Sequence, residues 1–415
     1  MIQPYRKIEN RLYCGKLILI IAPAIFILSA LLSACSISGA LGPIAITASP
    51  ESTIYFENPS EKSITLSTDN ESVDIHYTTD GSEPDNSSAK YIDPINITDT
   101  TVIKAKAYSK GKSVSETASF TYIFYTMETV PEYNNPDTAD YSIHFPYLGN
   151  TNSASIDPNV YLSPYKIGRY EIPKLLYDTV HTWAQNHGYG IGEGEADDNT
   201  ALPARSISWY DATKWCNAFT QYYNSKKGTN LEPVYYTNSD HTAIYKTGTS
   251  SSSDTENFTY EHLKWDADGF RLPTEPEYEY AARRTETDNG GEALIDPNYY
   301  SGYDGNPDAV TQYAWIEDNT SGEPMTVGAK SANYLGLYDM TGNVAEWCWR
   351  IFSETTDNSQ KLENPRSTSD EYRPYRGGSY KSSSSDATVT TTASNLPPDY
   401  PYNHIGFRVV RRVMP

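Results

Sequence analysis

The hydrophobic positions of this 415-residue chain follow three patterns, and each predicts a different kind of segment. Residues 17–32 form an apolar run that only Pro23 and Ser29 interrupt. Over residues 46–124, apolar and polar residues alternate with a period of two, which is typical of half-buried β-strands. From residue 164 to 415, helical spacings occur only in short stretches between irregular polar segments. The pattern therefore predicts an N-terminal apolar segment, an all-β domain and a second domain of mixed structure.

The N-terminal apolar run is typical of a secretory signal, because four basic residues precede it and it is short. The sequence Leu-Ser-Ala-Cys at residues 32–35 resembles the bacterial lipobox, in which the chain is cut before a cysteine that becomes lipidated. This resemblance implies a signal peptide at 1–34, lipidation of Cys35 and a tether at 35–45. Acyl chains would hold the protein at a membrane of the bacterial cell envelope, periplasmic or surface-exposed. A plain signal anchor with an incidental cysteine is the alternative.

The alternating region at 46–124 predicts a small antiparallel β-sandwich, because its short strand patterns are separated by turn sequences such as Asp80-Gly81 and Lys110-Gly111. The run from 75 to 84 and the residues after it resemble the chitobiase/β-hexosaminidase C-terminal-type repeat, an immunoglobulin-like β-domain. A carbohydrate-contacting module and a spacer are both compatible with this resemblance, and the spacer is favoured.

Two polar stretches follow the predicted sandwich. Residues 125–163 contain many Pro, Asn, Asp and Ser residues, which predicts a linker or an irregular segment before the second domain. Residues 192–199 are acidic but lack the alternating spacing of a calcium-binding EF-hand loop. A solvated loop is the favoured interpretation of this second stretch.

The second domain is predicted to contain at least three helices. The first begins near Pro173 and the second at Ser208, a plausible N-cap. The third begins at Thr274, which forms a capping box with Glu277 three residues later. Between these helices the sequence shows few regular patterns.

The net charge of −21 argues against nucleic acid and anionic lipid as partners, and it is compatible with cation binding. After removal of the signal and lipidation of Cys35, two cysteines remain, Cys216 and Cys348. An export compartment permits a disulfide between them. Burial without pairing is the favoured alternative.

The segment 336–347 combines glycines with two carboxylates, Asp339 and Glu346. Calcium prefers six to eight oxygen ligands, which carboxylates and backbone carbonyls supply. The carbonyls of Gly342 and Val344 are further candidates. A capped turn that leads into a buried strand explains the same residues without a metal.

Four segments resemble, in order, motifs of the formylglycine-generating-enzyme, or sulfatase-modifying-factor, family. They are residues 269–283, 336–347, 376–380 and 406–409. The resemblance implies a compact α+β domain with little regular secondary structure, related to the C-type lectin fold. The expected architecture is thus a multidomain chain with an immunoglobulin-like sandwich at 46–124 and this α+β domain at 164–415.

The resemblance also implies a structural calcium ion at 336–347. Asp339 and Glu346 would be side-chain ligands, and Gly342 and Val344 would contribute carbonyls.

Formylglycine-generating members need two cysteines after the Arg-Gly-Gly-Ser motif, where thiolates bind copper and exchange with the substrate thiol. Copper(I) selects thiolates, and the exchange requires sulfur. In this chain the two positions are Ser382 and Ala387, and no cysteine follows Cys348. We therefore expect no copper and no formylglycine-generating activity. An oxidoreductase of this superfamily with different chemistry is the alternative.

The segment 381–404 is rich in serine, threonine and tyrosine and lies between two glycine-containing motifs. Related members with the lectin-like fold use this region to display residues toward ligands, and tyrosine and serine suit adaptable binding surfaces. The candidate ligand-binding residues are Ser382, Ser384, Tyr400, Tyr402, Asn403 and His404. The ligand would be an unknown glycan or protein, so the sequence favours a binding or scaffolding module. Small polar residues that simply fill a former cleft are the alternative.

Overall fold

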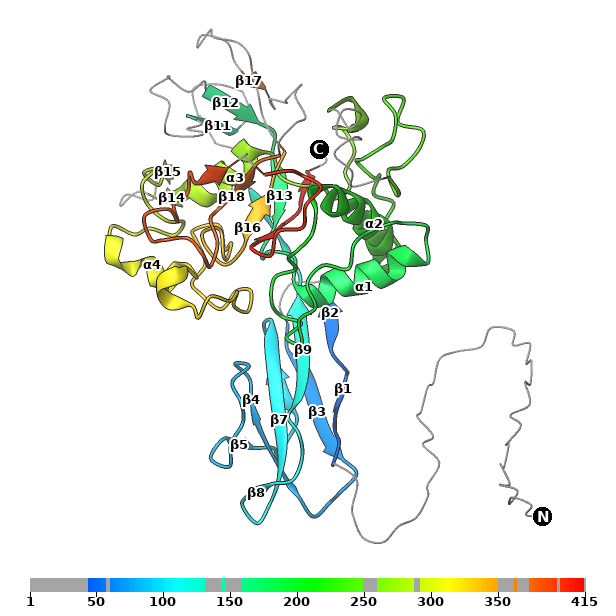
Figure 1. Cartoon of the computed structure of the whole chain (residues 1–415), viewed down its shortest axis with the longest axis vertical. Coiled ribbons are helices and arrows are strands. Elements are labelled where there is room, and N and C mark those ends of the chain that lie inside the picture. Colours follow the sequence, from blue (N-terminus) through cyan, green and yellow to red (C-terminus); the bar gives the residue numbers. More distant parts are fainter. Residues whose placement is uncertain are drawn as a thin grey trace, which may run out of the picture. The chain divides into compact units, whose positions relative to one another are not determined.

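The computed structural model describes most of the chain after the predicted tether (Figure 1). The described residues are 44–56, 60–130, 143–146, 159–248, 260–286, 292–349, 362–363, 373–393 and 396–413. The predicted signal peptide and the lipidation site Cys35 lie outside them. Within the described residues, no helix has both the length and the apolar character needed to span a bilayer.

The first part of the chain is a β-sandwich of two sheets (Figure 1). One sheet has the order β1-β3-β6, formed by Ile46–Ser49, Lys62–Thr68 and Ile95–Ile97. The other has the order β2-β9-β7-β4-β5, formed by Thr53–Tyr55, Ala118–Phe124, Thr101–Ser109, Asp74–Thr78 and Ala89–Lys90, with β8 (Lys112–Ser113) paired to β7. All pairings are antiparallel except that of β2 with β9. The all-β prediction for this region is therefore confirmed.

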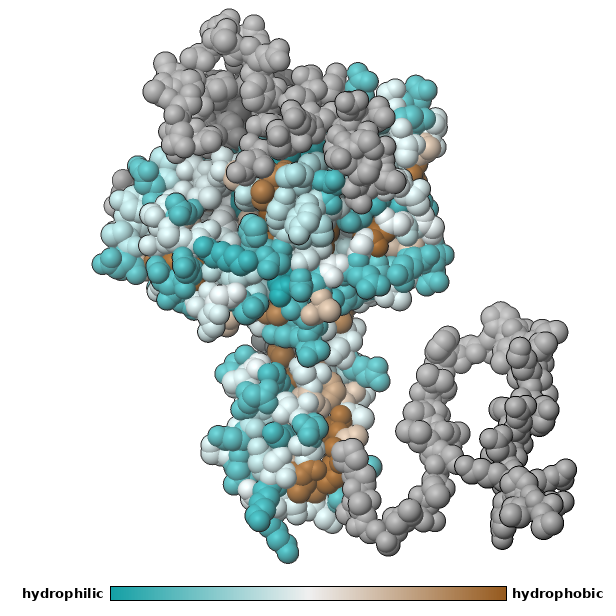
Figure 2. Space-filling model, in the orientation of Figure 1, coloured by the Kyte–Doolittle hydropathy of each residue, from teal (hydrophilic) through white to brown (hydrophobic). Residues whose placement is uncertain are grey.

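The sandwich core follows from the alternation in its sequence. On β3, Ile64 and Leu66 are buried while their neighbours are exposed. They pack with Ile103, Tyr122 and Phe124 from the facing sheet in one hydrophobic cluster. Burial of a large apolar side chain stabilises the fold by about 1.5–3 kcal/mol. Figure 2 shows hydrophilic residues over most of the coloured surface on the visible face.

The second domain has short strands and few helices. Its sheets are β10-β13-β21 (Met127–Val130, Tyr165–Gly168, Val410–Arg412), β19-β18-β16-β20 (Thr392–Ala393, Tyr375–Arg376, Ala345–Trp347, Ile405–Gly406), β11-β12-β17 (Ile143–Pro146, Asn159–Leu162, Leu362–Glu363) and β14-β15 (Arg284–Glu286, Glu292–Leu294). Its helices are α1 (Lys174–Gln185), α2 (Trp209–Lys227), α3 (Glu275–Arg283) and α4 (Val310–Tyr313), with 3-10 turns η2 (Tyr260–His262), η3 (Pro307–Ala309) and η4 (Glu317–Asn319). This α+β composition with sparse regular structure agrees with the prediction.

The segment predicted as a linker, 125–163, differs from expectation in its described parts. Its first residues form β10, which pairs antiparallel with β13 in the second domain. β11 and β12 also lie within it and pair with each other. Strands this short give a weak sequence signal, because their pairing partners and not their own pattern define them.

The predicted helix starts are confirmed. Pro173 occupies the N-cap of α1 in an extended conformation. The Ser208 hydroxyl accepts a hydrogen bond from the amide of Asp211 at the start of α2. At α3, Thr274 and Glu277 form the reciprocal capping box.

The core of the second domain is aromatic, and Trp209, Trp215 and Trp347 are fully buried in it. Val102 and Ile123 of the sandwich belong to the same hydrophobic cluster, so the sandwich packs directly on the second domain. The described cysteines, Cys216 and Cys348, are both buried and free, as the favoured alternative predicted.

Candidate functional site

The loop 336–347 adopts a backbone conformation that requires glycine at position 342. Gly342 adopts a φ of +81°, and a Cβ atom there would lie 2.3 Å from the carbonyl oxygen of Trp315. Asn343 donates its amide to that same carbonyl over 2.8 Å. Gly342 donates its amide to Gly377 of the Arg-Gly-Gly-Ser motif over 2.9 Å. The loop is therefore tied to two other segments through its main chain, and a side chain at 342 does not fit.

Glu346 forms a buried ion pair with Arg408. The Nε atom of Arg408 lies 2.7 Å from Oε2 of Glu346, and its Nη2 atom lies 2.7 Å from Oε1. Both side chains are 0% exposed. Arg408 also donates to the carbonyls of Gly168 and Tyr338, over 3.0 and 2.9 Å. One guanidinium thus joins three segments that are far apart in the sequence.

Two further carboxylates are buried near this pair. Asp339 accepts a hydrogen bond from the amide of Gly328 at Oδ2 over 2.7 Å, and its buried Oδ1 has no hydrogen-bond partner among the described residues. Burial raises the pKa of Asp339 to about 6. Glu171 accepts hydrogen bonds from the Val344 amide and the Asn343 side chain, over 2.9 and 2.7 Å. Burial, and then the charges of Asp339 and Glu346, raise the pKa of Glu171 well above its usual range.

Glu171 is not among the site residues that the sequence predicts. Its partners lie more than 170 positions away, so no local pattern indicates its burial.

In this arrangement the residues do not fit the predicted calcium ion. Both oxygens of Glu346 are engaged by Arg408, and a cation beside that guanidinium would be repelled. The described part of the chain contains no group of three or more His, Cys, Asp or Glu side chains able to hold a metal ion. Asp339, with its unpartnered Oδ1, is the one predicted side-chain ligand that remains available. Calcium binding with Asp339, Gly342, Val344 and Glu346 stays a prediction that requires Glu346 to leave Arg408.

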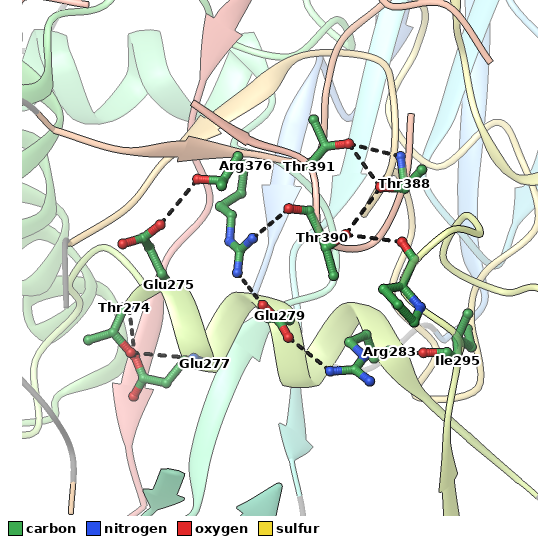
Figure 3. A network of polar contacts seen from close by, with 12 residues as sticks. Thr274, Glu275, Glu277, Glu279, Arg283, Ile295, Arg376, Thr388, Thr390 and Thr391 are labelled. Carbon is green, nitrogen blue, oxygen red and sulfur yellow. Dashed lines mark hydrogen bonds and ion pairs between the residues drawn. The ribbon is translucent and has the colours of Figure 1, made fainter. Parts of the chain in front are cut away.

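A second buried ionic network fixes the Arg-Gly-Gly-Ser motif (Figure 3). Glu279 of α3 accepts from Arg283 at 2.9 Å and from Arg376 at 2.5 Å. Arg376 also donates to the carbonyl of Thr390 over 3.0 Å. The Thr390 hydroxyl in turn donates to the carbonyl of Pro297. The base of the predicted ligand-binding segment is thereby held against α3.

The two positions where formylglycine-generating members carry cysteines have structural roles here. The Ser382 hydroxyl accepts the amide of Ser379 over 2.9 Å, which closes a turn after the Gly-Gly pair. Ala387 is 1% exposed and packs with Ala314 and Ile316 in a small apolar cluster. A methyl group in an apolar cluster supplies neither a metal ligand nor a nucleophile.

Three of the predicted ligand-binding residues lie together in the structure. The rings of Tyr400 and Tyr402 are 4.7 Å apart, and those of Tyr402 and His404 are 6.0 Å apart. Tyr375 continues the row at 6.4 Å from His404. We call Tyr375, Tyr400, Tyr402 and His404 the aromatic strip. Tyr400 is 59% exposed, whereas Trp347, which contacts Tyr402 and Tyr375 from below, is fully buried.

The backbone of the aromatic strip is fixed. Pro398 accepts the amide of Trp209 over 2.9 Å, and Tyr402 accepts the amide of Ser206 over 3.2 Å. Asn403 is exposed, and its side chain accepts a hydrogen bond from Lys381 over 2.8 Å. Burial, with the nearby charge of Lys381, lowers the pKa of His404, so this ring is neutral at pH 7.

The structure separates the other two predicted residues from this group. Ser382 is committed to its turn, and Ser384 is exposed on the loop that follows it. No hydrogen bond in the described residues connects Ser384 to the aromatic strip. The predicted ligand-binding set therefore divides into three clustered rings, Asn403 in contact with Lys381, and two serines with other surroundings.

Two cavities occur elsewhere in the described residues. The larger, about 430 Å³, lies beside the Arg271–Glu277 ion pair and Trp265. The smaller, about 160 Å³, lies among Phe56, Tyr125 and Phe219. The aromatic strip lines neither of these two cavities.

Comparison with known families identifies the class of protein. Residues 145–413 match the family described as sulfatase-modifying factor enzyme 1-like domain, and the chain belongs to this family. Residues 64–122 match a family described as Fn3 associated. For the sandwich, the comparison thus supports the Fn3-associated family, whereas the sequence motifs resemble the chitobiase/β-hexosaminidase C-terminal-type repeat.

Individual proteins are similar to this chain over different lengths. "Chaperone protein LppX" of Paenibacillus barcinonensis is 34% identical over 287 residues, which cover 62% of this chain and 84% of that protein. "Serine/threonine-protein kinase pkn1" of Chlamydia pneumoniae is 33% identical over 132 residues, 31% of this chain but only 19% of the kinase. Among solved structures, "Treponema denticola variable protein 1" is 25% identical with a TM-score of 0.51, covering 74% of this chain and 98% of that one.

Proposed function

We propose that this chain is an exported lipoprotein of the cell envelope whose sulfatase-modifying-factor-like domain binds a protein partner and does not oxidise cysteine. The observation that best supports the proposal is the aromatic strip. Its outermost ring, Tyr400, is 59% exposed, while the strip rests on the fully buried Trp347. Exposed tyrosines on a fixed backbone bind partners at a small cost in conformational entropy.

The positions of the missing thiols also support binding over oxidation. Ser382 completes a turn, and Ala387 lies in an apolar cluster. Conversion of either residue to a redox centre would require both a change of side chain and a rearrangement of its neighbours.

The relative from Paenibacillus barcinonensis carries the name of a chaperone protein. Its similarity extends over most of its own length, so we propose that this chain too holds incompletely folded protein segments. The exposed ring of Tyr400 offers such segments an adaptable aromatic contact.

A light-scattering assay tests this proposal directly. The full chain in lipid nanodiscs is mixed with a chemically denatured model protein as the denaturant is diluted. We expect the wild-type chain to suppress aggregation at near-stoichiometric amounts. The double variant Tyr400→Ala/Tyr402→Ala should lose most of this effect, because it removes the exposed rings.

Tyr334→Ala is the matched control, because Tyr334 is also half exposed but lies outside the aromatic strip. It should behave as the wild type does, and empty nanodiscs should have no effect. Equal suppression by the wild type and the double variant would remove the aromatic strip from the proposal.

Attachment to the membrane forms a separate part of the proposal, and it rests on the lipobox resemblance around Cys35. The wild type should incorporate labelled palmitate, and Cys35→Ala should not. A wild type that incorporates no label but stays in the membrane fraction would favour the plain signal anchor.

A further inference from the structure

We infer that the partner of the aromatic strip is an extended, positively charged polypeptide segment, which lies along the rings and directs lysine or arginine side chains toward Glu195, Glu323 and Asp399. This inference rests on the proposed function and names the chemistry of the partner.

Several carboxylates surround Arg205, a residue whose side chain is only 7% exposed. Its Nη2 atom lies 3.0 Å from Asp197 and 3.8 Å from Glu323, and its Nη1 atom lies 3.7 Å from Glu195. Three carboxylates thus surround one guanidinium. The side chains of Glu195 and Glu323 are 41% and 73% exposed, so the surplus negative charge faces the solvent.

This acidic group adjoins the aromatic strip. Ser206, the residue after Arg205, donates its amide to the Tyr402 carbonyl and its hydroxyl to Glu195. Asp399, the residue before Tyr400, adds a fourth carboxylate next to the rings. Burial raises the pKa of Tyr402, and the charge of Asp399 raises it further. The strip and the carboxylates therefore form one continuous surface.

The cations already present on this surface show how it accommodates positive charge. The ammonium group of Lys381 lies 5.3 Å from the centre of the Tyr380 ring and donates to Asn403. Tyrosine faces attract cations within about 6 Å. Arg205 is the cation that contacts Glu195, Asp197 and Glu323, and Lys174, whose charge also acts on Asp197, is paired with Asp178. A surplus of carboxylates remains for a partner's cations.

The spacing of the rings also fits an extended partner. Tyr400, Tyr402 and His404 alternate in the sequence, and their successive centroids are 4.7 and 6.0 Å apart. An extended polypeptide places every second side chain on one face, about 6–7 Å apart. In a partner strand, the apolar side chains on one face can therefore contact successive rings. The residues between them can then contact the carboxylates.

Fluorescence anisotropy with two labelled peptides tests this inference. One peptide alternates lysine and valine, and the other alternates glutamate and valine at the same length. We expect the full chain in nanodiscs to bind the lysine peptide at least about tenfold more tightly at low salt, because like charges across an interface are unfavourable. Added salt should reduce this preference.

Variants separate the contribution of charge from that of the rings. Glu195→Gln/Glu323→Gln should weaken binding of the lysine peptide severalfold and leave the glutamate peptide unchanged or slightly better bound. Glu51→Gln/Glu71→Gln, at exposed positions of the sandwich, is the matched control and should match the wild type. Tyr400→Ala/Tyr402→Ala should weaken both peptides.

The outcomes distinguish the inference from the proposed function. Equal binding of the two peptides, lost with the tyrosines, would overturn the charge preference and leave the protein-binding function standing. Binding of a neutral oligosaccharide such as chitohexaose, with neither peptide bound, would overturn both. A lysine preference that survives the Glu195→Gln/Glu323→Gln change would overturn the assignment of these carboxylates.

Discussion

The β-sandwich and the second domain stabilise their backbones in different ways. In the sandwich, long ladders such as β4-β7 and β7-β9 pair the main-chain groups, and an ion pair such as Lys90–Asp74 has side chains that are 50% and 56% exposed. In the second domain the strands are two to four residues long, and the ion pairs Arg408–Glu346 and Arg376–Glu279 are fully buried.

A domain with little regular secondary structure needs other hydrogen-bond donors for its buried backbone. Buried carbonyl groups need hydrogen-bond donors, and loops do not supply them as sheets do. In the second domain, arginines take this role, as when Arg408 donates to the carbonyls of Gly168 and Tyr338. Side-chain ionic networks thus substitute for ladders, so single charged residues should matter far more here than in the sandwich.

The largest effect that tests this comparison is expected for Arg408→Met. The change leaves the Glu346 carboxylate buried and unpaired, which costs about 3–5 kcal/mol of unfolding free energy. Denaturant unfolding followed by tryptophan fluorescence measures it. A loss below about 1 kcal/mol would mean that the buried pair does not carry the stability assigned to it.

The next largest effect is expected for Gly342→Ala. The new Cβ would lie 2.3 Å from a main-chain oxygen at a φ of +81°, so we expect a loss of about 2–4 kcal/mol from strain and displacement of the loop. Gly111→Ala in the sandwich is the control, because its φ is +76° but its nearest neighbour is 3.7 Å away. It should lose only about 1 kcal/mol. Similar losses in both variants would show that the close approach at Gly342 is unimportant.

A smaller effect should appear as a pH dependence at Asp339. Its folded pKa of about 6 exceeds the unfolded value of about 3.9, so the folded state binds a proton more tightly than the unfolded state. Stability from this group is complete below pH ~4 and is lost as the pH rises through 6, by on the order of 2 kcal/mol.

The measurement is the difference in unfolding free energy between Asp339→Asn and the wild type at pH 4 and pH 7, with a chelator present. The unfolding free energy of the variant should increase relative to that of the wild type as the pH rises. The same titration with added calcium tests the metal prediction. A calcium-dependent stabilisation that Asp339→Asn abolishes would support calcium binding there and would imply that Glu346 leaves Arg408.

The smallest effect is expected for Lys90→Ala in the sandwich. Its ion pair with Asp74 is about half exposed, so the loss should be at most about 0.5 kcal/mol and should shrink further with salt. Thermal unfolding at low and high ionic strength measures it. A loss comparable to that of Arg408→Met would contradict the contrast between the two regions.

The features that could be predicted from the sequence are those that local spacing determines. The strand alternation of the sandwich and the caps at Ser208 and Thr274 depend on neighbouring residues, and all are confirmed. The sequence nominates Tyr400, Tyr402 and His404 as ligand-binding candidates, but the contact of their rings depends on the bend and turn at residues 400–405, which their spacing does not indicate.

The features that could not be predicted join distant segments. Arg408 reaches Glu346 and Gly168 across 62 and 240 positions, and Glu171 reaches Asn343 across 172. A carboxylate that pairs with an arginine and one that binds calcium look the same in a sequence. Which of the two a carboxylate does depends on the residues that the fold brings next to it, and no local pattern indicates those residues.

The sheet β10-β13-β21 has a mechanical consequence. β10 leads out of the sandwich, and β21 is the last described strand; both pair with β13, antiparallel to it. A force applied between the sandwich and a bound partner would enter the second domain through β10. The four residue pairs between β10 and β13 would then resist separation of β10 from the second domain.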